Sequence, residues 1–455
     1  MRIRIAPGGQ VRGLARVPGD KSIAHRWLIL AGTARGTSEI ADLPAALDVR
    51  STARCLAALV PKARPSLEDW LASPPVGGQT QRSTSNGSGP RPSSSRVSFH
   101  AEGRAGLEAP SAELDCGNSG TTMRLLAGVL AGVSFETVLT GDESLRARPM
   151  ERVARPLREM GATVETTDGR PPMRIRGGRL RGISYRCPVP SAQVKGAVLL
   201  AAVTAEGETT VLEPAPTRDH TERALAHLGA PIRMLAPGEV RCSAFQHSGF
   251  AGRVPGDISS AAFLVAATAL TGGELRIEGV GLNPSRTHFL EVMARMGIPT
   301  ETRVLGEELG EPVGELIVRP PRDLVGTTVP AEELPLVIDE VPVLASLACH
   351  ARGESRFAGA GELRVKESDR LEGLAAMVRG LGGAAVVEGD DLVLAGGRLR
   401  GGTASARGDH RMAMAAVVAA LGARAEVEVE GVEVADVSFP GFLETLRALG
   451  ASIEG

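Results

Sequence analysis

Hydrophobic residues along this chain form apolar stretches that each end in an apolar residue followed by glycine. Gly161, Gly229, Gly297, Gly382 and Gly450 stand at these ends. A left-handed residue commonly closes a helix, and glycine adopts that conformation without steric cost, so each stretch is predicted to be a helix. Three of the four intervals between these glycines are 68 residues long and the fourth is 85. Such regular spacing predicts a repeated structural unit.

Runs of alternating apolar and polar residues separate the helices and predict β-strands, as at Thr209–Leu212 and Leu392–Leu394. A further helix of the same kind is expected to end near Leu59. A chain of 455 residues is too long for one core, so we expect six α/β units in two domains. Ser73–Arg96 is rich in Ser, Gly and Pro, and is predicted to be a mobile, low-complexity, dispensable insertion.

A short sequence, Val-Pro-Gly-Asp, occurs twice, at Val17–Asp20 and at Val254–Asp257. Each copy precedes an apolar helix, and each Asp is a good N-cap residue. The two copies are expected to mark matching points in two similar halves of the chain.

The composition excludes several classes of protein. Aromatic residues make up 3%, too few for the stacking platforms that bind single-stranded nucleic acid, and the net charge of −2 gives no overall attraction to nucleic acid or anionic lipid. The five cysteines form no C-x-x-C pair, which favours a reducing compartment and disfavours structural zinc. Without a signal-like N-terminus or an apolar run of 18 residues, the protein is predicted to be cytoplasmic.

Charged and polar residues stand at the starts of the predicted helices. Lys21 and Ser22 lie in a first turn with Arg26 one turn later, and free backbone N–H groups there favour an anion. Asn118 is a predicted helix cap before Gly120, whose lack of a side chain lets an anion approach the backbone. Further candidates are Arg148, held extended before Pro149, and Ser191, Gln193, Arg218, Asp339, Lys366, Glu367, Arg370 and Arg411.

These candidates are more informative together than singly. Each charged segment alone has a simpler interpretation as a solvated surface. The segment Arg364–Arg370 is predicted to be a helix that presents Lys366 and Arg370 on one face. Because the segments flank similar helices in both halves, we expect them to converge on one cationic cleft that also holds carboxylates. Such a cleft suits two polyanionic substrates and proton transfer, and does not suit a Ser-His-Asp hydrolase.

Seven motifs occur in a fixed order along the chain: Gly19–Ser22 with Arg26, Gly117–Thr121, Arg148–Met150, Ser191–Lys195, Arg218–Glu222, Arg364–Arg370 and Asp409–Arg411. Together they resemble the 3-phosphoshikimate 1-carboxyvinyltransferase (EPSP synthase) family of enolpyruvyl transferases, across the whole chain except Ser73–Arg96. The resemblance implies an α/β fold of two similar domains, each of three βαβαββ units (an inside-out α/β barrel), with the active site in the interdomain cleft. It places one domain at residues 17–252 and the other at residues 1–16 plus 253–455.

The resemblance also implies an activity: transfer of the enolpyruvyl group of phosphoenolpyruvate to the 5-hydroxyl of shikimate 3-phosphate, in chorismate and aromatic amino acid biosynthesis. The implied reaction needs no cofactor or metal. From the composition we expect no nucleic-acid or membrane partner, and a monomer is the default expectation. Shikimate 3-phosphate would contact Lys21, Ser22, Arg26, Ser191, Gln193, Arg218, Asp339 and Lys366. Phosphoenolpyruvate would contact Lys21, Gly120, Arg148, Gln193, Arg370 and Arg411.

The implied reaction is an addition followed by an elimination, which needs groups that move protons. Asp339 is the candidate base and Glu367 the candidate proton donor, and Lys21 takes part in proton movement. Many relatives carry Pro where this chain has Leu125, and Lys where it has Val437. Because Gly120 is retained, we still expect the protein to be a target of the herbicide glyphosate.

Three alternatives have different sequence signatures. The sister transferase acting on UDP-N-acetylglucosamine typically has a reactive Cys before its Arg-Pro, and Gly141–Pro149 contains none. A non-catalytic anion-binding protein of the same fold would be favoured by loss of Lys21, Asp339, Glu367 or Arg411, all of which are present. The near-neutral charge and few aromatic residues disfavour an RNA-end-processing enzyme.

Overall fold

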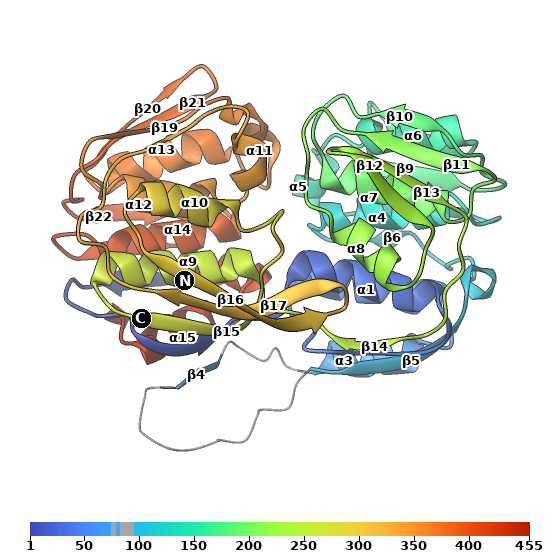
Figure 1. The fold of residues 1–455 in the computed structure, drawn as a ribbon, viewed down its shortest axis with the longest axis horizontal. Helices are drawn as coiled ribbons and strands as arrows, with labels where there is room; N and C mark the ends of the chain where they lie inside the picture. Colours follow the sequence, from blue (N-terminus) through green and yellow to red (C-terminus); the bar gives the residue numbers. More distant parts are fainter. Residues whose placement is uncertain (74–78, 82–94) are drawn as a thin grey trace.

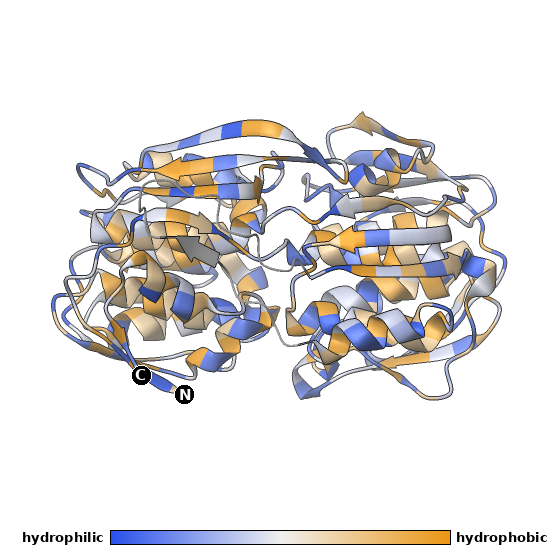
Figure 2. Ribbon diagram, turned by 90° about the horizontal axis from the view of Figure 1, so that it is seen from below, coloured by the Kyte–Doolittle hydropathy of each residue, from blue (hydrophilic) through white to orange (hydrophobic). Residues whose placement is uncertain are grey.

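The computed structural model describes residues 1–73, 79–81 and 95–455, which form two lobes (Figure 1). The N-lobe is built around a hydrophobic core of residues between Ile23 and Val254, joined by Leu309. The C-lobe is built around a core of residues between Ile3 and Ala15 and between Ile258 and Ile453. Both chain termini lie in the C-lobe (Figures 1 and 2).

Six small sheets share one pattern, in which a parallel pair of strands continues into antiparallel neighbours. The N-lobe sheets are β14-β3-β5 (Ala251–Arg253, Arg35–Ala41, Val97–Glu102), β6-β7-β9-β8 (Leu114–Asp115, Glu136–Thr140, Arg170–Arg176, Thr163–Thr167) and β10-β11-β13-β12 (Ser184–Arg186, Glu208–Leu212, Glu239–Ser243, Ile232–Ala236). The C-lobe sheets are β16-β17-β15-β2-β4 (Thr300–Glu308, Glu311–Val318, Leu275–Gly281, Gly13–Arg16, Gln79–Gln81), β18-β19-β21-β20 (Thr328–Val329, Glu354–Phe357, Asp391–Ala395, Ala384–Glu388) and β22-β23-β1-β24 (Gly402–Ser405, Val427–Glu430, Arg2–Ile5, Ile453–Glu454). This repetition confirms the predicted repeated unit.

Each lobe encloses three almost wholly buried helices. They are α1 (Lys21–Thr33), α4 (Gly120–Leu130) and α7 (Ala192–Ala202) in the N-lobe, and α9 (Ile258–Thr271), α12 (Val341–Ala348) and α14 (His410–Leu421) in the C-lobe. The hydrophobic residues that favour these helices lie between the sheets (Figure 2). Since interior residues cannot reach water, the charged side chains of α1, α4, α7 and α14 lie in the first two turns of these helices.

The remaining helices lie around these cores. In the N-lobe they are α2 (Leu47–Leu59), α3 (Arg64–Ala72), η1 (Arg104–Gly106), α5 (Glu143–Arg146), α6 (Glu151–Met160) and α8 (His220–His227). In the C-lobe they are α10 (His288–Arg295), α11 (Leu334–Val337), η2 (Ala360–Val365), α13 (Arg370–Gly380), η3 (Val432–Val437) and α15 (Phe442–Leu449). The predicted glycines after five of the fifteen α-helices described all have positive φ. No helix in the described ranges is long and apolar enough to cross a membrane.

Three local expectations need correction or restriction. Ser119, not Asn118, caps α4, because the Ser119 hydroxyl accepts a hydrogen bond from the backbone N–H of Thr122 at 3.1 Å. Arg364–Arg370 is not one helix: η2 ends at Val365 and α13 begins at Arg370, after Asp369 caps it. Most of Ser73–Arg96 lies outside the described residues, although its residues 79–81 form strand β4 beside β2.

Candidate functional site

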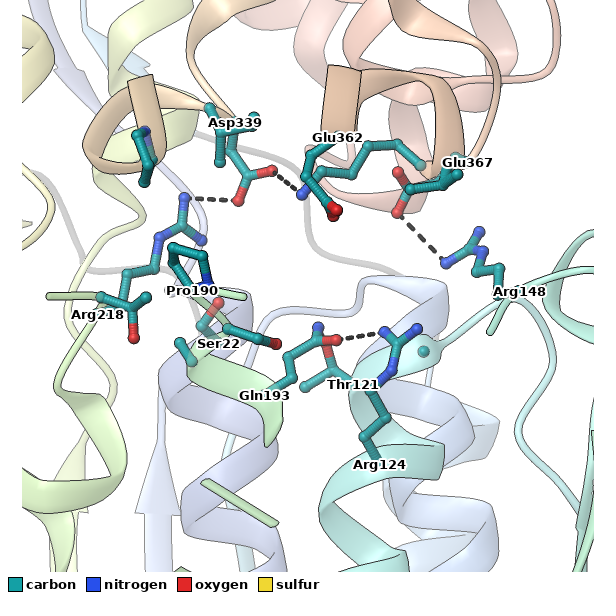
Figure 3. Close-up of a pocket in the computed structure, with 18 of the residues that line it drawn as sticks. Ser22, Thr121, Arg124, Arg148, Pro190, Gln193, Arg218, Asp339, Glu362 and Glu367 are labelled. Atoms are coloured by element: carbon teal, nitrogen blue, oxygen red, sulfur yellow. Dashed lines mark hydrogen bonds and ion pairs between the residues drawn. The ribbon is translucent and has the colours of Figure 1, made fainter. Parts of the chain in front are cut away.

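The starts of four inner helices, α1, α4, α7 and α14, border a pocket between the lobes, with a cavity volume of about 270 Å³. All thirteen residues predicted to form the site line this pocket: Lys21, Ser22, Arg26, Gly120, Arg148, Ser191, Gln193, Arg218, Asp339, Lys366, Glu367, Arg370 and Arg411. Figure 3 shows Asp339 and Glu367 on one side of the pocket facing Arg218 and Arg148 on the other. The fold therefore brings together predicted site residues that lie up to 390 positions apart in the sequence.

Lys21 is the first residue of α1, and Asp20 caps that helix by accepting a hydrogen bond from the Ile23 N–H at 2.9 Å. The Lys21 ammonium donates to the carboxylate of Asp48, in the first turn of α2, at 2.8 Å. Burial would raise the pKa of Asp48, but the charge of Lys21 outweighs it and lowers that pKa below its ordinary value. Asp48 is therefore ionised at neutral pH and fixes the ammonium at the pocket wall.

Arg26 lies one turn further along α1 and is 3% exposed. Its Nη1 donates to the backbone oxygen of Ser22 and its Nε to the hydroxyl of Thr221, both at 2.8 Å. Burial lowers the pKa of Arg26 to about 10, which leaves the guanidinium charged at neutral pH. This arrangement places a fixed positive charge in the lining of the pocket.

A second cationic group surrounds the start of α4. The Nη2 of Arg148 donates to Asn118 at 2.6 Å and to Ser144 at 3.3 Å. Arg124 donates to the side-chain oxygen of Gln193, whose amide donates to Thr121 at 2.8 Å. The free backbone N–H groups of the first helical turn add to these guanidinium groups, so the region has the properties of an anion site.

Asp339 is the centre of the opposite wall. Its carboxylate lies 2.6 Å from Arg218 of the N-lobe, 3.3 Å from Lys366 and 3.8 Å from Arg370. Burial would raise the pKa of Asp339, but the charges of Arg218, Lys366 and Arg411 outweigh it and hold that pKa well below its usual range. The carboxylate is thus ionised and able to accept a proton.

Glu367 is the second carboxylate of this wall, and Arg370 is its cationic partner. Arg370 is 1% exposed, and its guanidinium contacts Glu367 at 2.7 Å and Asp409 at 2.7 Å. Burial would raise the pKa of Glu367, but the charge of Arg370 outweighs it and lowers that pKa well below its usual value. Burial and the charge of Lys21 lower the pKa of His410 to about 3, so the neighbouring imidazole is neutral at physiological pH.

Among the residues that line the described pocket, three ion pairs join one lobe to the other. Arg218 contacts Asp339, Arg148 contacts Glu367 at 3.6 Å, and Arg152 contacts Glu362 at 3.4 Å. In each pair the N-lobe supplies the cation and the C-lobe the carboxylate. The two lobes are therefore complementary in charge across the site.

Several pocket residues were not assigned a role from the sequence. Thr121 and His410 lie inside the seven motifs, whereas Asp48, Arg124, Arg152 and Glu362 lie outside all of them. Asp48 gave one usable signal, since a carboxylate in a first helical turn interacts favourably with the helix dipole. Within the described ranges, no group of three or more His, Cys, Asp or Glu side chains is arranged to hold a metal ion.

The arrangement can hold two anionic groups next to ionised carboxylates, and comparison with known proteins agrees with it. The family model for EPSP synthase (3-phosphoshikimate 1-carboxyvinyltransferase) matches residues 5–84 and 93–446. The chain belongs to the EPSP synthase family. A relative in Halorhodospira halophila, named 3-phosphoshikimate 1-carboxyvinyltransferase, is 46% identical over 99% of this chain and 96% of its own.

Other members of the EPSP synthase family extend this likeness. A protein of the same name in Acidithiobacillus ferrooxidans is 42% identical, covering 100% of this chain and 99% of its own. The solved structure of EPSP synthase from Acinetobacter baumannii superposes with a TM-score of 0.81 at 37% identity, covering 100% of this chain and 99% of that one. The predicted two-domain α/β fold is confirmed.

Proposed function

We propose that this member of the EPSP synthase family transfers the enolpyruvyl group of phosphoenolpyruvate to the 5-hydroxyl of shikimate 3-phosphate and releases phosphate. The observation that carries the proposal is the single pocket lined by every residue of the predicted site. Its cations suit the phosphates and carboxylates of both substrates, and its carboxylates suit proton transfer.

The two substrates are assigned to different parts of the pocket. Shikimate 3-phosphate would lie against Lys21, Ser22, Arg26, Ser191, Gln193, Arg218, Asp339 and Lys366. Phosphoenolpyruvate would lie against Lys21, Gly120, Gln193, Arg148, Arg370 and Arg411. Lys21 and Gln193 belong to both sets, which would place the reacting atoms between α1 and α7 and the C-lobe wall.

The reaction balances without a covalent enzyme intermediate. The 5-hydroxyl oxygen bonds to C2 of phosphoenolpyruvate and loses its proton to the enzyme, while the methylene carbon C3 gains a proton to become a methyl group. The tetrahedral species then loses a proton from that methyl group and expels phosphate, which restores the double bond. Cations around the pocket stabilise the charge that develops on the phosphate and carboxylate.

Asp339 is the proposed base and Glu367 the proposed proton donor. In the free protein the cations around them lower the pKa of both carboxyl groups. Substrate anions that contact Arg218, Lys366 and Arg370 would draw these charges away from the carboxylates. The pKa of both groups should therefore rise on binding, which makes Asp339 a stronger base and allows Glu367 to carry a proton.

The proposal also covers the domain organisation, the cellular location and the oligomeric state. We infer two domains, residues 17–252 and residues 1–16 plus 253–455, supported by two separate hydrophobic cores. The protein is proposed to act in the cytoplasm as a monomer, without nucleic-acid or membrane partners, in the shikimate pathway.

Phosphate release from the purified protein tests the function. Shikimate 3-phosphate plus phosphoenolpyruvate should release phosphate, and UDP-N-acetylglucosamine plus phosphoenolpyruvate should not. Lys21→Ala should abolish release, whereas Lys62→Ala, at a lysine whose side chain is 56% exposed and distant from the pocket lining, should not. Release only with the sugar nucleotide would assign the sister activity, and silence with both would favour a non-catalytic anion-binding protein.

A further inference from the structure

The Val-Pro-Gly-Asp sequence occurs twice, but its second copy is not explained by the pocket. Lys21 follows the first copy and lines the pocket, whereas neither Val254–Asp257 nor α9 contributes to the described lining. The two copies bind each other instead. The N–H of Asp20 donates to the oxygen of Pro255 at 2.7 Å, and the N–H of Asp257 donates to the oxygen of Pro18 at 2.8 Å. This reciprocal pairing joins the starts of an N-lobe and a C-lobe helix.

Arg286, between β15 and α10, lies among the side chains of this junction and is 2% exposed. Its Nη1 lies 2.9 Å from a carboxylate oxygen of Asp20, and its Nη2 lies 3.5 Å from one of Asp257. Nη2 also donates to the Ser259 hydroxyl at 2.6 Å. Two buried carboxylates close together repel each other, so this guanidinium supplies the compensating charge.

The same guanidinium reaches a second helix that borders the pocket. Nη1 donates to Nε2 of His220 at 3.0 Å, which leaves the His220 proton on Nδ1, where it is donated to Glu311 at 2.7 Å. His220 is the first residue of α8 and lines the pocket two positions after Arg218. One arginine therefore holds the starts of both α1 and α8.

The two carboxyl groups differ in the direction of their pKa shifts. Burial would raise the pKa of Asp20, but the charge of Arg286 outweighs it and lowers that pKa below its ordinary value. Burial and the charge of Asp20 raise the pKa of Asp257 to about 6. The stronger link of Arg286 is therefore to Asp20, the residue adjacent to Lys21.

We propose that Arg286 is a positioning residue for the transfer reaction, which fixes Lys21 through Asp20 and Arg218 through His220. Arg286 does not line the described pocket, so it acts without touching the substrates. The inference rests on the proposed function. Its test therefore includes a measurement on Lys21 that needs no catalysis.

Arg286→Met should lower kcat/KM by about 100-fold, because a displacement of about 1 Å at a reacting group can cost that much. Arg286→Lys should retain more activity than Arg286→Met, since an ammonium group keeps the charge but lacks the guanidinium's separate donors. Arg286→Lys also serves as the second variant if Arg286→Met does not fold. Arg104→Met is the matched control: Arg104 donates to the backbone oxygens of Val129 and Leu200, away from the pocket, and its kcat/KM should stay within about threefold of the wild type.

A double variant separates positioning from simple charge compensation. Adding Asp257→Asn to Arg286→Met removes one carboxylate and should recover part of the lost Tm. If Arg286 only neutralised charge, the double variant would also recover kcat/KM. Positioning through Asp20 and His220 predicts that kcat/KM stays low.

Labelling with an amine-reactive reagent measures the reactivity of the Lys21 ammonium group without any substrate turnover. In Arg286→Met, and in Arg286→Lys to a smaller degree, labelling of Lys21 should change at least threefold relative to the exposed Lys62 in the same sample. Unchanged Lys21 labelling in a folded variant, or a double variant with wild-type kcat/KM, would overturn the inference. A wild type that releases no phosphate would contradict the proposed function, while Lys21 labelling would still decide the role of Arg286.

Discussion

Gly120 lies where the backbone of α4 is closest to the pocket cations. A Cβ atom at this position would lie 2.8 Å from Nη1 of Arg124 and 3.4 Å from Nη1 of Arg148. The contact with Arg124 forces that guanidinium to move, because 2.8 Å is below the normal separation of carbon and nitrogen, whereas 3.4 Å is an ordinary contact. The absence of a side chain here is therefore required for the cation geometry around the proposed phosphoenolpyruvate position.

Gly120→Ala should raise the KM for phosphoenolpyruvate by about tenfold or more, a loss of about 1.4 kcal/mol of binding, with little change in the KM for shikimate 3-phosphate. The physical reason is displacement of the Arg124 guanidinium. The matched control is Gly306→Ala, because a Cβ atom there meets nothing within 4 Å. Equal effects on both KM values would argue against a phosphoenolpyruvate site at this position.

Glyphosate should inhibit the wild-type protein in competition with phosphoenolpyruvate, because Gly120 adds no side chain between the backbone of α4 and the guanidinium groups around the proposed phosphoenolpyruvate position. Leu125 is fully buried within α4, so it can act on the inhibitor only by shifting the helix. Inhibition curves at several phosphoenolpyruvate concentrations measure this. A curve that stays flat into the millimolar range would contradict the prediction.

Buried histidines make a separate prediction for acid stability. Burial lowers the pKa of His350 to about 4, and its Nε2 donates to the oxygen of Ala419 at 2.8 Å. Between pH 6.5 and 4 the unfolded chain binds a proton at His350 that the folded protein does not. The free energy of unfolding should therefore fall as the pH falls through this window, by up to about 1.4 kcal/mol per pH unit for this group.

Urea denaturation at several pH values tests this, with His350→Gln expected to reduce the slope. The exposed His100→Gln is the control and should leave the slope unchanged. A slope unaffected by His350→Gln would show that other groups cause the acid sensitivity.

Helices and strands were predictable where local chemistry decides them. The glycines after the helices, and the Asp20 and Asp257 caps, follow from backbone sterics and from side-chain hydrogen bonding, which a sequence displays directly. The interruption of the helix before Arg370 was missed. The spacing of the charges in Arg364–Arg370 suggested one continuous helix, whereas Asp369 caps a new helix inside this segment. Ordered motifs of the family located the pocket residues within these elements.

Other parts of the site depend on packing between elements. Asp48 reaches Lys21 because α2 packs beside α1, and Arg152 meets Glu362 because the lobes approach each other. Neither contact follows from spacing along the chain. The sequence therefore predicted the motif residues, while the charged partners that surround them required the structure.

The β16–β17 hairpin shows the same dependence on packing. Leu309 and Gly310 at its turn both have positive φ, a conformation that favours Asn-Gly over Leu-Gly. Leu309 is nevertheless 3% exposed, because it packs into the N-lobe core although its strands belong to the C-lobe. Tertiary burial thus outweighs the local preference of the turn.

Leu309→Asn should lower the free energy of unfolding by about 2–4 kcal/mol, because it removes a buried side chain from the N-lobe core even though it suits the turn. Leu305→Asn, on the same hairpin at 69% exposure, should change it by less than about 0.5 kcal/mol. Guanidinium denaturation measures both. A stabilised Leu309→Asn would mean that turn strain, not burial, dominates at this position.

At the scale of the whole molecule, three ion pairs between residues of the described pocket lining join the two lobes. Two of them use Arg218 and Arg148, which the substrates are proposed to contact, so binding should weaken those pairs. The Arg152–Glu362 pair is the most exposed of the three, with side-chain exposures of 23% and 48%. Neither Arg152 nor Glu362 is assigned to a substrate, so of these three pairs it is the one best able to persist while substrates occupy the pocket.

Reversing one charge of this pair should favour separation of the lobes. Arg152→Glu should raise the KM for both substrates several-fold, because an exposed pair contributes roughly 0.2–1 kcal/mol and the reversal adds repulsion. The double variant Arg152→Glu with Glu362→Arg should recover most of that loss. Arg155→Glu on the same helix, which breaks only the exposed pair with Glu159, is the control and should leave both KM values unchanged. Recovery in the double variant would identify a contact between lobes, since a direct substrate contact of Arg152 could not be restored from Glu362.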